Sequence, residues 1–403
     1  MNTKKNILLL TTIYPAPDLK NRTSVIHFFT KEWVKSGLGV KVIYFNVIYP
    51  RIFYFIAKLF REKIASVTGA IVDTSRANKN LQYSMDGVTI HRIPLFKLIP
   101  QGRFSEKILK AQPNRVFKIN TESNFIPDII IGHFSNPQIF LVCELKKIYP
   151  QAKTCIVMHD AGANIKKIYK SNYIKLINSI DIWGFRSKPF KESFEAEYGK
   201  RTKTFMCYSG IPKEFIIQNT QKHFSDRLYK FVYVGDFIKL KNIIPLIKGL
   251  YKAYPDKMFE LSLIGSGYEE ANIISLINTL ELKKNIKFLG RLNRNDVMTQ
   301  LQDADCFIMI SAPEAFGLVY LEAMANGCIT IGSRNEGIDG VIKHEVNGFL
   351  CEAGNDRELA EVIHQINRLA PEDRLKISKN AMATAKEMTD TKVAEDYITS
   401  LIK

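Results

Sequence analysis

The chain has 403 residues, of which 46% are apolar and 24% are charged. This composition excludes a disordered chain, and the length exceeds what one hydrophobic core usually serves, so we expect two domains of about 200 residues each. The formal net charge is +17, and residues 1–200 carry the whole excess, with 31 Lys and Arg against 14 Asp and Glu. The basic half predicts an acidic partner, either an anionic membrane surface or a phosphate-bearing substrate; the alternative is a solvated basic surface without a partner.

The six cysteines lie mostly in apolar runs and form no C-x-x-C pair. This usage is typical of reduced core residues in a cytosolic protein. Lys4 and Lys5 precede an apolar stretch that Thr11, Thr12 and Pro15 end too early for a secretory signal. No uninterrupted apolar run reaches the roughly 18 residues that a membrane span needs. We therefore expect a cytoplasmic protein.

The chain begins with the pattern of a parallel α/β sheet. Residues 6–13 (NILLLTTI) predict a strand, and the Pro-containing residues 14–22 predict the loop that follows it. Residues 25–35 have helical periodicity, and residues 40–45 predict the next strand. This strand–helix–strand start is typical of a doubly wound sheet.

Residues 47–65 (VIYPRIFYFIAKLFREKIA) interleave apolar side chains with cations. A helix starting near Arg51 would gather an apolar face made of Phe53, Ile56, Ala57 and Phe60. Such a face flanked by cations favours an interfacial helix on anionic lipid, and the basic, apolar residues 95–110 favour the same reading. The alternative is a helix that packs its apolar side on the sheet.

Polar residues follow two further predicted strands of the first half. His133 comes after the run at residues 128–131, and His159 comes directly after residues 154–158. Because ligands bind where parallel strands end, both histidines are candidate site residues. Residues 179–185 and 203–208 predict later strands.

The alternation starts again in the second half, with predicted strands at residues 231–234, 261–264 and 286–289. Gly235 and Asp236 leave the first of these strands, Lys241 precedes a helix that begins near Asn242, and Arg291 follows the third. A lysine at a strand end before a helix suits an anion. The alternative is a solvated lysine.

The most informative stretch is residues 311–327, SAPEAFGLVYLEAMANG, which follows a core strand at residues 306–310. A helix is predicted at residues 318–326, and Gly327 occupies the position of a left-handed helix stop. The free N–H groups of Phe316, Gly317 and Leu318 would form a concavity for phosphate or sugar oxygens.

Two carboxylates, Glu314 and Glu322, flank this helix start. They are acceptor-only groups suited to binding hydroxyls. The alternative is that they only complement the helix dipole.

The spacing of the two glutamates resembles the E-x7-E signature of retaining glycosyltransferases. The longer pattern S-x-x-E-x-F-G-x-x-x-x-E-A-M-A-x-G resembles glycosyltransferase family 4, and the likeness is strong from about residue 232 to residue 350. The resemblance implies an α/β chain of GT-B fold, with two Rossmann-like, doubly wound parallel-sheet domains that face a central cleft. We expect an acceptor-binding domain at residues 1–209, a nucleotide-sugar-binding domain at residues 210–385, and a C-terminal helix at residues 386–403 that crosses back.

The resemblance also implies roles for the candidates. The sugar would lie between Glu314 and His159, and Lys241 would neutralise the leaving diphosphate. The remaining donor-binding residues are Gly235, Asp236, Arg291, Phe316, Gly317, Leu318 and Glu322, the last of them on the ribose. Acceptor-side residues are Asn21, Arg22 and His133.

The chain departs from the family pattern at two places. Residues 21–24 replace a Gly-rich turn, and Asp236 stands where the family commonly has an arginine. Lys239 could supply the missing cation, because a flexible ammonium acts as a point charge. Asp303 and Asp305 match a metal-binding D-x-D only superficially, since they precede the core strand.

The resemblance implies a retaining, metal-independent, hexosyltransferase-type enzyme without a cofactor. Its donor would be a UDP- or GDP-linked sugar. We expect a lipid-linked saccharide acceptor in bacterial surface polysaccharide synthesis, a peripheral position on the inner face of the cell membrane, and no nucleic-acid partner. The alternatives are a sugar phosphorylase or nucleotide-sugar epimerase of the same fold, and a non-enzymatic basic binding protein.

Overall fold

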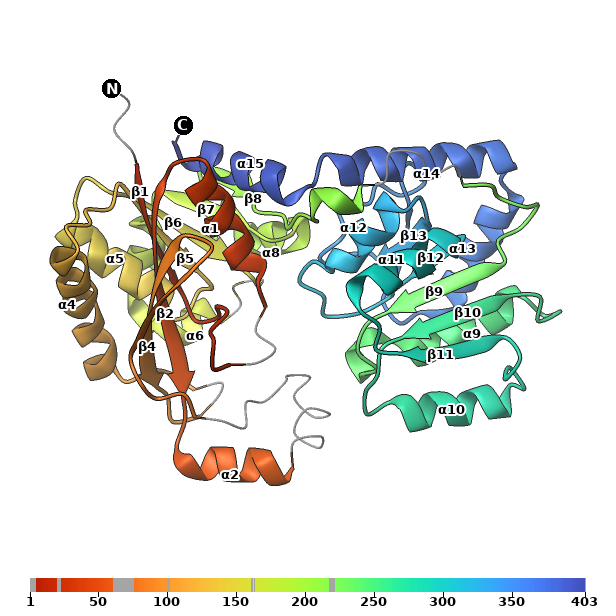
Figure 1. Cartoon of the computed structure of the whole chain (residues 1–403), viewed down its shortest axis with the longest axis horizontal. Coiled ribbons are helices and arrows are strands. Elements are labelled where there is room, and N and C mark those ends of the chain that lie inside the picture. Colours follow the sequence, from red (N-terminus) through yellow and green to blue (C-terminus); the bar gives the residue numbers. More distant parts are fainter. Residues whose placement is uncertain are drawn as a thin grey trace.

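The computed structural model describes residues 5–19, 23–60, 76–99, 102–160, 162, 164–216 and 222–402. Two α/β domains lie next to each other, and the last helix returns to the first domain (Figure 1). Each domain is built on its own sheet, with eight strands in the first and six in the second among the described residues. The expected architecture of two doubly wound sheets is confirmed.

The first sheet has the order β3-β4-β2-β1-β5-β6-β7-β8. Its strands are β1 (Asn6–Thr11), β2 (Gly39–Ile48), β3 (Leu81–Met85), β4 (Val88–Phe96), β5 (Ile129–His133), β6 (Lys153–Met158), β7 (Ile182–Phe185) and β8 (Thr204–Met206). Neighbours run parallel, except that β3 pairs antiparallel with β4. The sequence pattern did not predict this hairpin. Its two-residue turn consists of Asp86 and Gly87, both at positive φ, as tight hairpin turns require.

The helices of the first domain are α1 (Val25–Lys35), α2 (Arg51–Leu59), α4 (Glu106–Glu122), α5 (Gln138–Ile148), α6 (Ile165–Tyr169), α7 (Tyr173–Asn178) and α8 (Lys188–Tyr198), with a short 3-10 turn η1 (Lys170–Asn172). A further 3-10 turn, η2 (Lys213–Phe215), lies in the segment that leads to the second domain. The bounds of α1 are those predicted from its periodicity. It buries Phe29 and Trp33.

The second sheet has the order β11-β10-β9-β12-β13-β14, and all its recorded pairs are parallel. Its strands are β9 (Lys230–Val234), β10 (Glu260–Ile264), β11 (Ile286–Gly290), β12 (Cys306–Ile308), β13 (Ile329–Ser333) and β14 (Phe349–Cys351). Its helices are η3 (Lys239–Lys241), α9 (Ile243–Ala253), α10 (Glu270–Thr279), α11 (Arg294–Asp303), α12 (Leu318–Ala325), α13 (Asp356–Arg368) and α14 (Pro371–Lys386). The aspartates of the D-x-D-like motif hold the start of β9. Asp305 accepts the backbone N–H groups of Tyr229 and Lys230 at 2.9 Å, and Asp303 pairs with the Lys230 ammonium.

The final helix, α15 (Asp390–Ile402), packs against α1 of the first domain. Trp33 Nε1 donates to the backbone oxygen of Ala394 at 2.9 Å, and the ring of Tyr397 meets the rings of Phe29 and Trp33 edge to face. The interdomain segment pairs with the start of this crossing at Ile211 and Thr389. The two chain segments between the domains therefore lie side by side.

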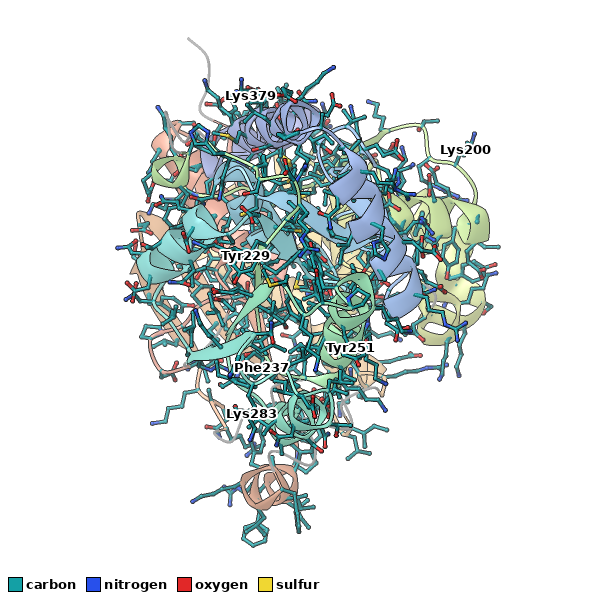
Figure 2. The ribbon with its side chains drawn as sticks, turned by 90° about the vertical axis from the view of Figure 1, so that its right-hand side faces the viewer. Lys200, Tyr229, Phe237, Tyr251, Lys283 and Lys379 are labelled. Carbon is teal, nitrogen blue, oxygen red and sulfur yellow. The ribbon has the colours of Figure 1, made fainter. Side chains whose placement is uncertain are left out.

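Helix α2 lies below the rest of the molecule in Figures 1 and 2. Its protein-facing side consists of Tyr54 and Ala57, which are 9% and 0% exposed. Ile56 and Phe60, which the helical pattern grouped with Ala57, are instead 43% and 52% exposed. Only one edge of the helix meets the domain, so the grouped residues are divided: Ala57 faces the domain, whereas Ile56 and Phe60 remain exposed. Residues 61–65 of this segment lie outside the described residues.

None of the described helices is long and apolar enough to cross a membrane.

Candidate active site

The candidate site lies where the order of the second sheet reverses. Strand β9 is flanked by β10 on one side and β12 on the other, so the loops that leave β9 and β12 diverge to opposite sides of the sheet. Open parallel sheets bind ligands at such a switch point. The first loop carries Asp236 and Lys241, and the second carries Ser311, Glu314 and the start of α12.

The two loops are joined by an ion pair between Lys241 and Glu314. Lys241 Nζ lies 2.5 Å from Glu314 Oε2, and both side chains are partly buried, at 22% and 12% exposure. Ser311 Oγ donates to the same oxygen at 3.2 Å. Glu314 Oε1 has no recorded partner among the described residues, so one oxygen is left for a ligand hydroxyl.

The loop that carries Glu314 is held by a third segment, after β13. The backbone N–H of Glu314 donates to Glu336 Oε2 at 2.6 Å, and the N–H of Gly337 donates to the backbone oxygen of Glu314 at 2.8 Å. A Cβ on Gly337 would lie 2.3 Å from the carbonyl carbon of Ala315, so only glycine allows this approach. Burial, together with the negative charge of Glu314, raises the pKa of Glu336.

The start of α12 presents free donors next to this ion pair. Within the described ranges, no protein acceptor is recorded for the N–H groups of Phe316, Gly317 and Leu318. Gly317 adopts φ +77°, which favours glycine. The ring of Phe316 lies 5.7 Å from the guanidinium of Arg186 and 5.7 Å from the ring of Tyr208, both from the first domain. The helix start is therefore packed against the opposite domain through a side chain, while its N–H groups have no protein partner among the residues that the structure describes.

Glu322 lies one helical turn further on and pairs with Arg294, the first residue of α11. Arg294 Nε and Nη2 both donate to Glu322 Oε1, at 3.1 and 2.6 Å. The guanidinium also lies 4.4 Å from the ring centre of Phe215. Glu322 is only 8% exposed, and its Oε2 has no recorded partner in the described part of the chain. Among the described residues, each of the two glutamates thus keeps one carboxylate oxygen without a hydrogen-bond partner.

A cation does lie next to Asp236, but it comes from another strand. Arg291 follows β11, and its Nη2 donates to Asp236 Oδ1 at 2.6 Å while its Nε donates to Ser266 Oγ at 2.7 Å. Lys239 is exposed at the same rim and has no recorded ion pair in the described residues. The structure therefore brings a guanidinium beside the position that lacks the family's arginine.

His159 and His133 form a hydrogen-bonded pair at the rim of the first sheet. His133 Nδ1 lies 2.9 Å from His159 Nε2, and His133 Nε2 lies 3.2 Å from the hydroxyl of Tyr397. His159 is partly exposed and stacks on Phe134, with ring centres 4.0 Å apart. His133 is fully buried, so its predicted place on the acceptor side is corrected: it lies behind His159. Asn21 and Arg22, the other acceptor-side candidates, lie outside the described residues.

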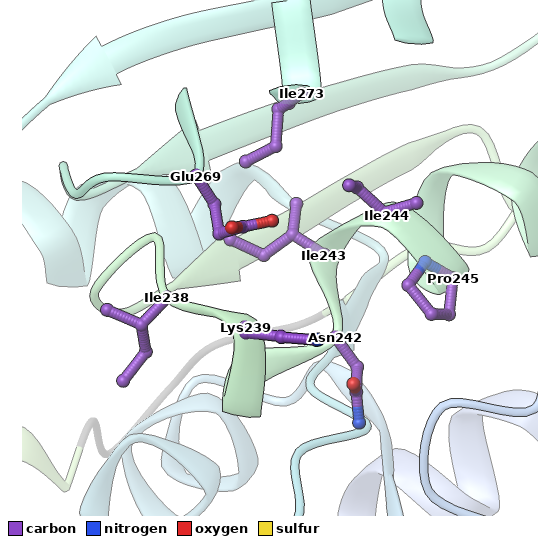
Figure 3. Close-up of a pocket in the computed structure, with 8 residues that line it drawn as sticks. All are labelled: Ile238, Lys239, Asn242, Ile243, Ile244, Pro245, Glu269 and Ile273. Atoms are coloured by element: carbon purple, nitrogen blue, oxygen red, sulfur yellow. The ribbon is translucent and has the colours of Figure 1, made fainter. Parts of the chain in front are cut away.

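The described residues also line a separate pocket, open to solvent, of about 220 Å³ beside η3 (Figure 3). Its lining is mostly aliphatic, with the carboxylate of Glu269 among the side chains of Ile238, Ile243 and Ile273. None of Lys241, Glu314 and Glu322 lines it. This pocket is therefore not the site that the two glutamates define.

Comparison with known families decides what kind of domain this is. Residues 215–384 match the family described as "Glycosyl transferases group 1". Residues 215–384 belong to that family. The match places the Lys241–Glu314 pair, Glu322 and Arg294 all inside the group 1 glycosyl transferase domain.

Curated relatives agree with this assignment. The chain is 31% identical over 172 residues to the N-acetyl-alpha-D-glucosaminyl L-malate synthase of Bacillus anthracis, covering 43% of this chain and 42% of that protein. It is 28% identical over 330 residues to the lipopolysaccharide core biosynthesis glycosyltransferase LpsD of Rhizobium meliloti, covering 78% and 82%. The chain spans less than half the length of each of the first two curated relatives, 42% of one and 46% of the other.

Solved structures extend the likeness to the whole fold. Anabaena HepE, solved in complex with UDP, superposes with a TM-score of 0.68 at 17% identity, over 98% of this chain and 99% of that one. The outer core galactosyltransferase WaaB superposes with a TM-score of 0.66 at 16% identity, over 98% and 99%. The chain with the group 1 glycosyl transferase domain therefore has the GT-B fold.

Four residues around the site were not found from the sequence. Arg294, Glu336 and Arg186 contact the predicted residues from distant segments, and Tyr397 reaches His133 from the C-terminal helix. No spacing in the sequence relates them to the motif. The sequence offered a signal only for Arg294, which is a basic residue that follows a predicted strand and a turn at the point where α11 begins.

Proposed function

We propose that this protein transfers a sugar from a UDP- or GDP-linked donor to an acceptor hydroxyl and keeps the anomeric configuration of the donor. One observation carries the proposal: Lys241 pairs with Glu314 of the loop that leads into α12, whose first N–H groups have no protein acceptor in the described part of the chain. An ammonium and a helix N-terminus suit a diphosphate, and a carboxylate suits sugar hydroxyls.

In the proposed reaction, the bond between the anomeric carbon and the diphosphate oxygen breaks first. The negative charge that develops on the diphosphate is stabilised by Lys241 and by the N–H groups of Phe316 and Gly317. The acceptor oxygen then bonds to the anomeric carbon from the face the diphosphate leaves, and its proton passes to the departing phosphate. Glu314 and His159 hold the sugar from opposite domains, and Glu322 binds the ribose hydroxyls.

Release of free nucleoside diphosphate tests this function. A panel of UDP and GDP sugars is first screened by the rise in melting temperature, because a ligand that binds the native state stabilises it. The stabilising donor is then incubated with and without candidate acceptors. A transferase releases UDP or GDP only when an acceptor is present. Phosphate-dependent release of a sugar phosphate indicates a phosphorylase, donor isomerisation indicates an epimerase, and binding without any turnover indicates a non-enzymatic protein.

We further propose that the acceptor is a lipid-linked saccharide and that the first domain binds an anionic membrane. Supporting this, α2 exposes large apolar side chains, with Ile52 at 67%, Phe55 at 65% and Leu59 at 60% exposure. Two cations, Arg51 and Lys58, lie on the same helix and are exposed. An apolar face flanked by exposed cations is typical of helices that lie in a membrane interface.

The double variant Phe55→Ser, Leu59→Ser is expected to lower the affinity for phosphatidylglycerol vesicles at least tenfold. Each apolar side chain that leaves water contributes about 1.5–3 kcal/mol. Co-sedimentation measures the effect, and Ile174→Ser, Ile274→Ser is the matched control, since both isoleucines are exposed and lie on other helices. Equal sedimentation with neutral and anionic vesicles would remove the membrane proposal.

A further inference from the structure

The C-terminal helix reaches the sugar side of the candidate site through one hydrogen-bonded chain. It runs from the Tyr397 hydroxyl to His133 Nε2 at 3.2 Å, and from His133 Nδ1 to His159 Nε2 at 2.9 Å. Tyr397 lies on α15, His133 is the last residue of β5, and His159 directly follows the neighbouring strand β6. The chain therefore joins residues that are 264 positions apart in the sequence.

The direction of the hydrogen bonds follows from the single proton of the tyrosine. Tyr397 is 1% exposed, and His133 is the only recorded acceptor for its hydroxyl in the described part of the protein. A buried hydroxyl proton without an acceptor costs more than an unused lone pair, so Tyr397 donates to His133 Nε2. Burial also raises the pKa of Tyr397 well above its ordinary value, which keeps the hydroxyl protonated.

The tautomers of both histidines then follow in turn. With Nε2 of His133 as an acceptor, its proton lies on Nδ1, and this N–H donates to Nε2 of His159. His159 must then carry its own proton on Nδ1. We infer that Tyr397 and His133 are positioning residues that fix His159 in the Nδ1–H tautomer, so that His159 offers a hydrogen-bond donor to an oxygen of the substrate and does not act as a base.

Electrostatics around the pair favours the same neutral state. Burial lowers the pKa of His133 to about 3, and the positive charge of Arg186 acts in the same direction. Burial likewise lowers the pKa of His159 well below its ordinary value, with His133 and Arg186 as further causes. Arg186 is 3% exposed and donates to the backbone oxygen of Cys207 at 2.6 Å, so its charge is fixed beside the histidines.

The assignment is tested first on the whole chain without any substrate. Long-range proton–nitrogen NMR spectra of histidine-labelled protein distinguish a protonated from an unprotonated ring nitrogen, and His159→Gln identifies the signals of His159. The expected result is a protonated Nδ1 and an unprotonated Nε2 in His159. A proton on Nε2 of His159 would overturn the inference.

The variant Tyr397→Phe removes the hydroxyl and keeps the ring. In this variant, His159 is expected to become a mixture of the two neutral tautomers. The kcat for transfer is expected to fall about 2- to 10-fold, which corresponds to the free energy of one hydrogen bond. Tyr149→Phe is the matched control, because it removes a hydroxyl bonded to Asn120 elsewhere in the same domain. A purely structural role for Tyr397 would lower the melting temperature and leave the His159 spectrum unchanged, and that result would also overturn the inference.

The role of His159 toward the sugar rests on the proposed function, whereas its tautomer does not. A parent protein that releases no nucleoside diphosphate would contradict the proposed function and leave the spectrum to decide the tautomer. A parent that turns over with His159 protonated on Nε2 would contradict only this inference.

Discussion

Replacing Lys241 by methionine is expected to lower kcat about 100- to 1000-fold, the usual effect of removing one preorganised group that stabilises developing negative charge. Lys241 ends η3, two residues before α9 begins, and its Nζ lies 2.5 Å from Glu314 Oε2. In the proposed reaction, a leaving diphosphate would meet this ammonium and the N–H groups at the start of α12. Methionine keeps an unbranched side chain that is one atom shorter and removes the charge. Steady-state release of nucleoside diphosphate, with donor and acceptor both saturating, measures the effect.

The control for this substitution is Lys248→Met. Lys248 is an exposed lysine of α9, in the same domain, and takes part in no ion pair recorded among the described residues. The Lys248→Met substitution removes the same charge as Lys241→Met, but it does so outside the candidate site. A Lys241→Met enzyme with a kcat within threefold of both the parent and this control would show that Lys241 does not stabilise the leaving group.

Replacing Glu322 by glutamine is expected to weaken donor binding about 10- to 150-fold, because hydrogen bonds to a charged group contribute about 1.5–3 kcal/mol. Both hydrogen bonds from Arg294 end on Oε1, so Oε2 is the oxygen that we propose binds the ribose hydroxyls. Glutamine turns one of these acceptors into a donor, which either faces the guanidinium or fails to accept from the ribose. Titration calorimetry with the donor, and with the free nucleoside diphosphate, measures the change.

Glu358→Gln is the matched control for the Glu322 variant. Glu358 also pairs with an arginine, Arg334, and is 24% exposed in the same domain. It lies on α13 and contacts none of the candidate residues, so donor affinity is expected to stay unchanged. Equal donor affinity in the Glu322 variant and the parent would contradict the ribose assignment.

Features that depend on neighbouring residues were accessible from the sequence. The bounds of α1 were predicted from its periodicity, and the helix after Gly317 ends at Ala325, two residues before Gly327, which adopts the left-handed φ of +72° expected of a helix stop. The contiguous motif around Glu314 was enough to predict the family and the fold. Side-chain periodicity and turn chemistry act within a few residues, and a single sequence displays them directly.

The sequence was insufficient where exposure depended on distant packing. The pattern of α2 grouped Ile56 with Ala57 and left open which side meets the protein; in the structure Ile56 is 43% exposed and Ala57 is fully buried. Any core helix shows such a stripe, so periodicity alone does not tell which side meets the protein and which remains exposed. The position of His133 was misjudged for the same reason, since the helix that covers it, α15, comes from the other end of the chain.

The sequence by itself determined the alternation of strands and helices, the acidic motif at a helix start, and a lysine at the end of a strand. Only the tertiary structure decided which of these residues meet: Lys241 with Glu314 across 73 positions, Arg294 with Glu322, and Tyr397 with His133. The physical reason is that these contacts depend on the order of strands in each sheet and on the return of α15 to the first domain. Strand order and helix docking are set by burial summed over the whole core, which no short stretch of sequence encodes.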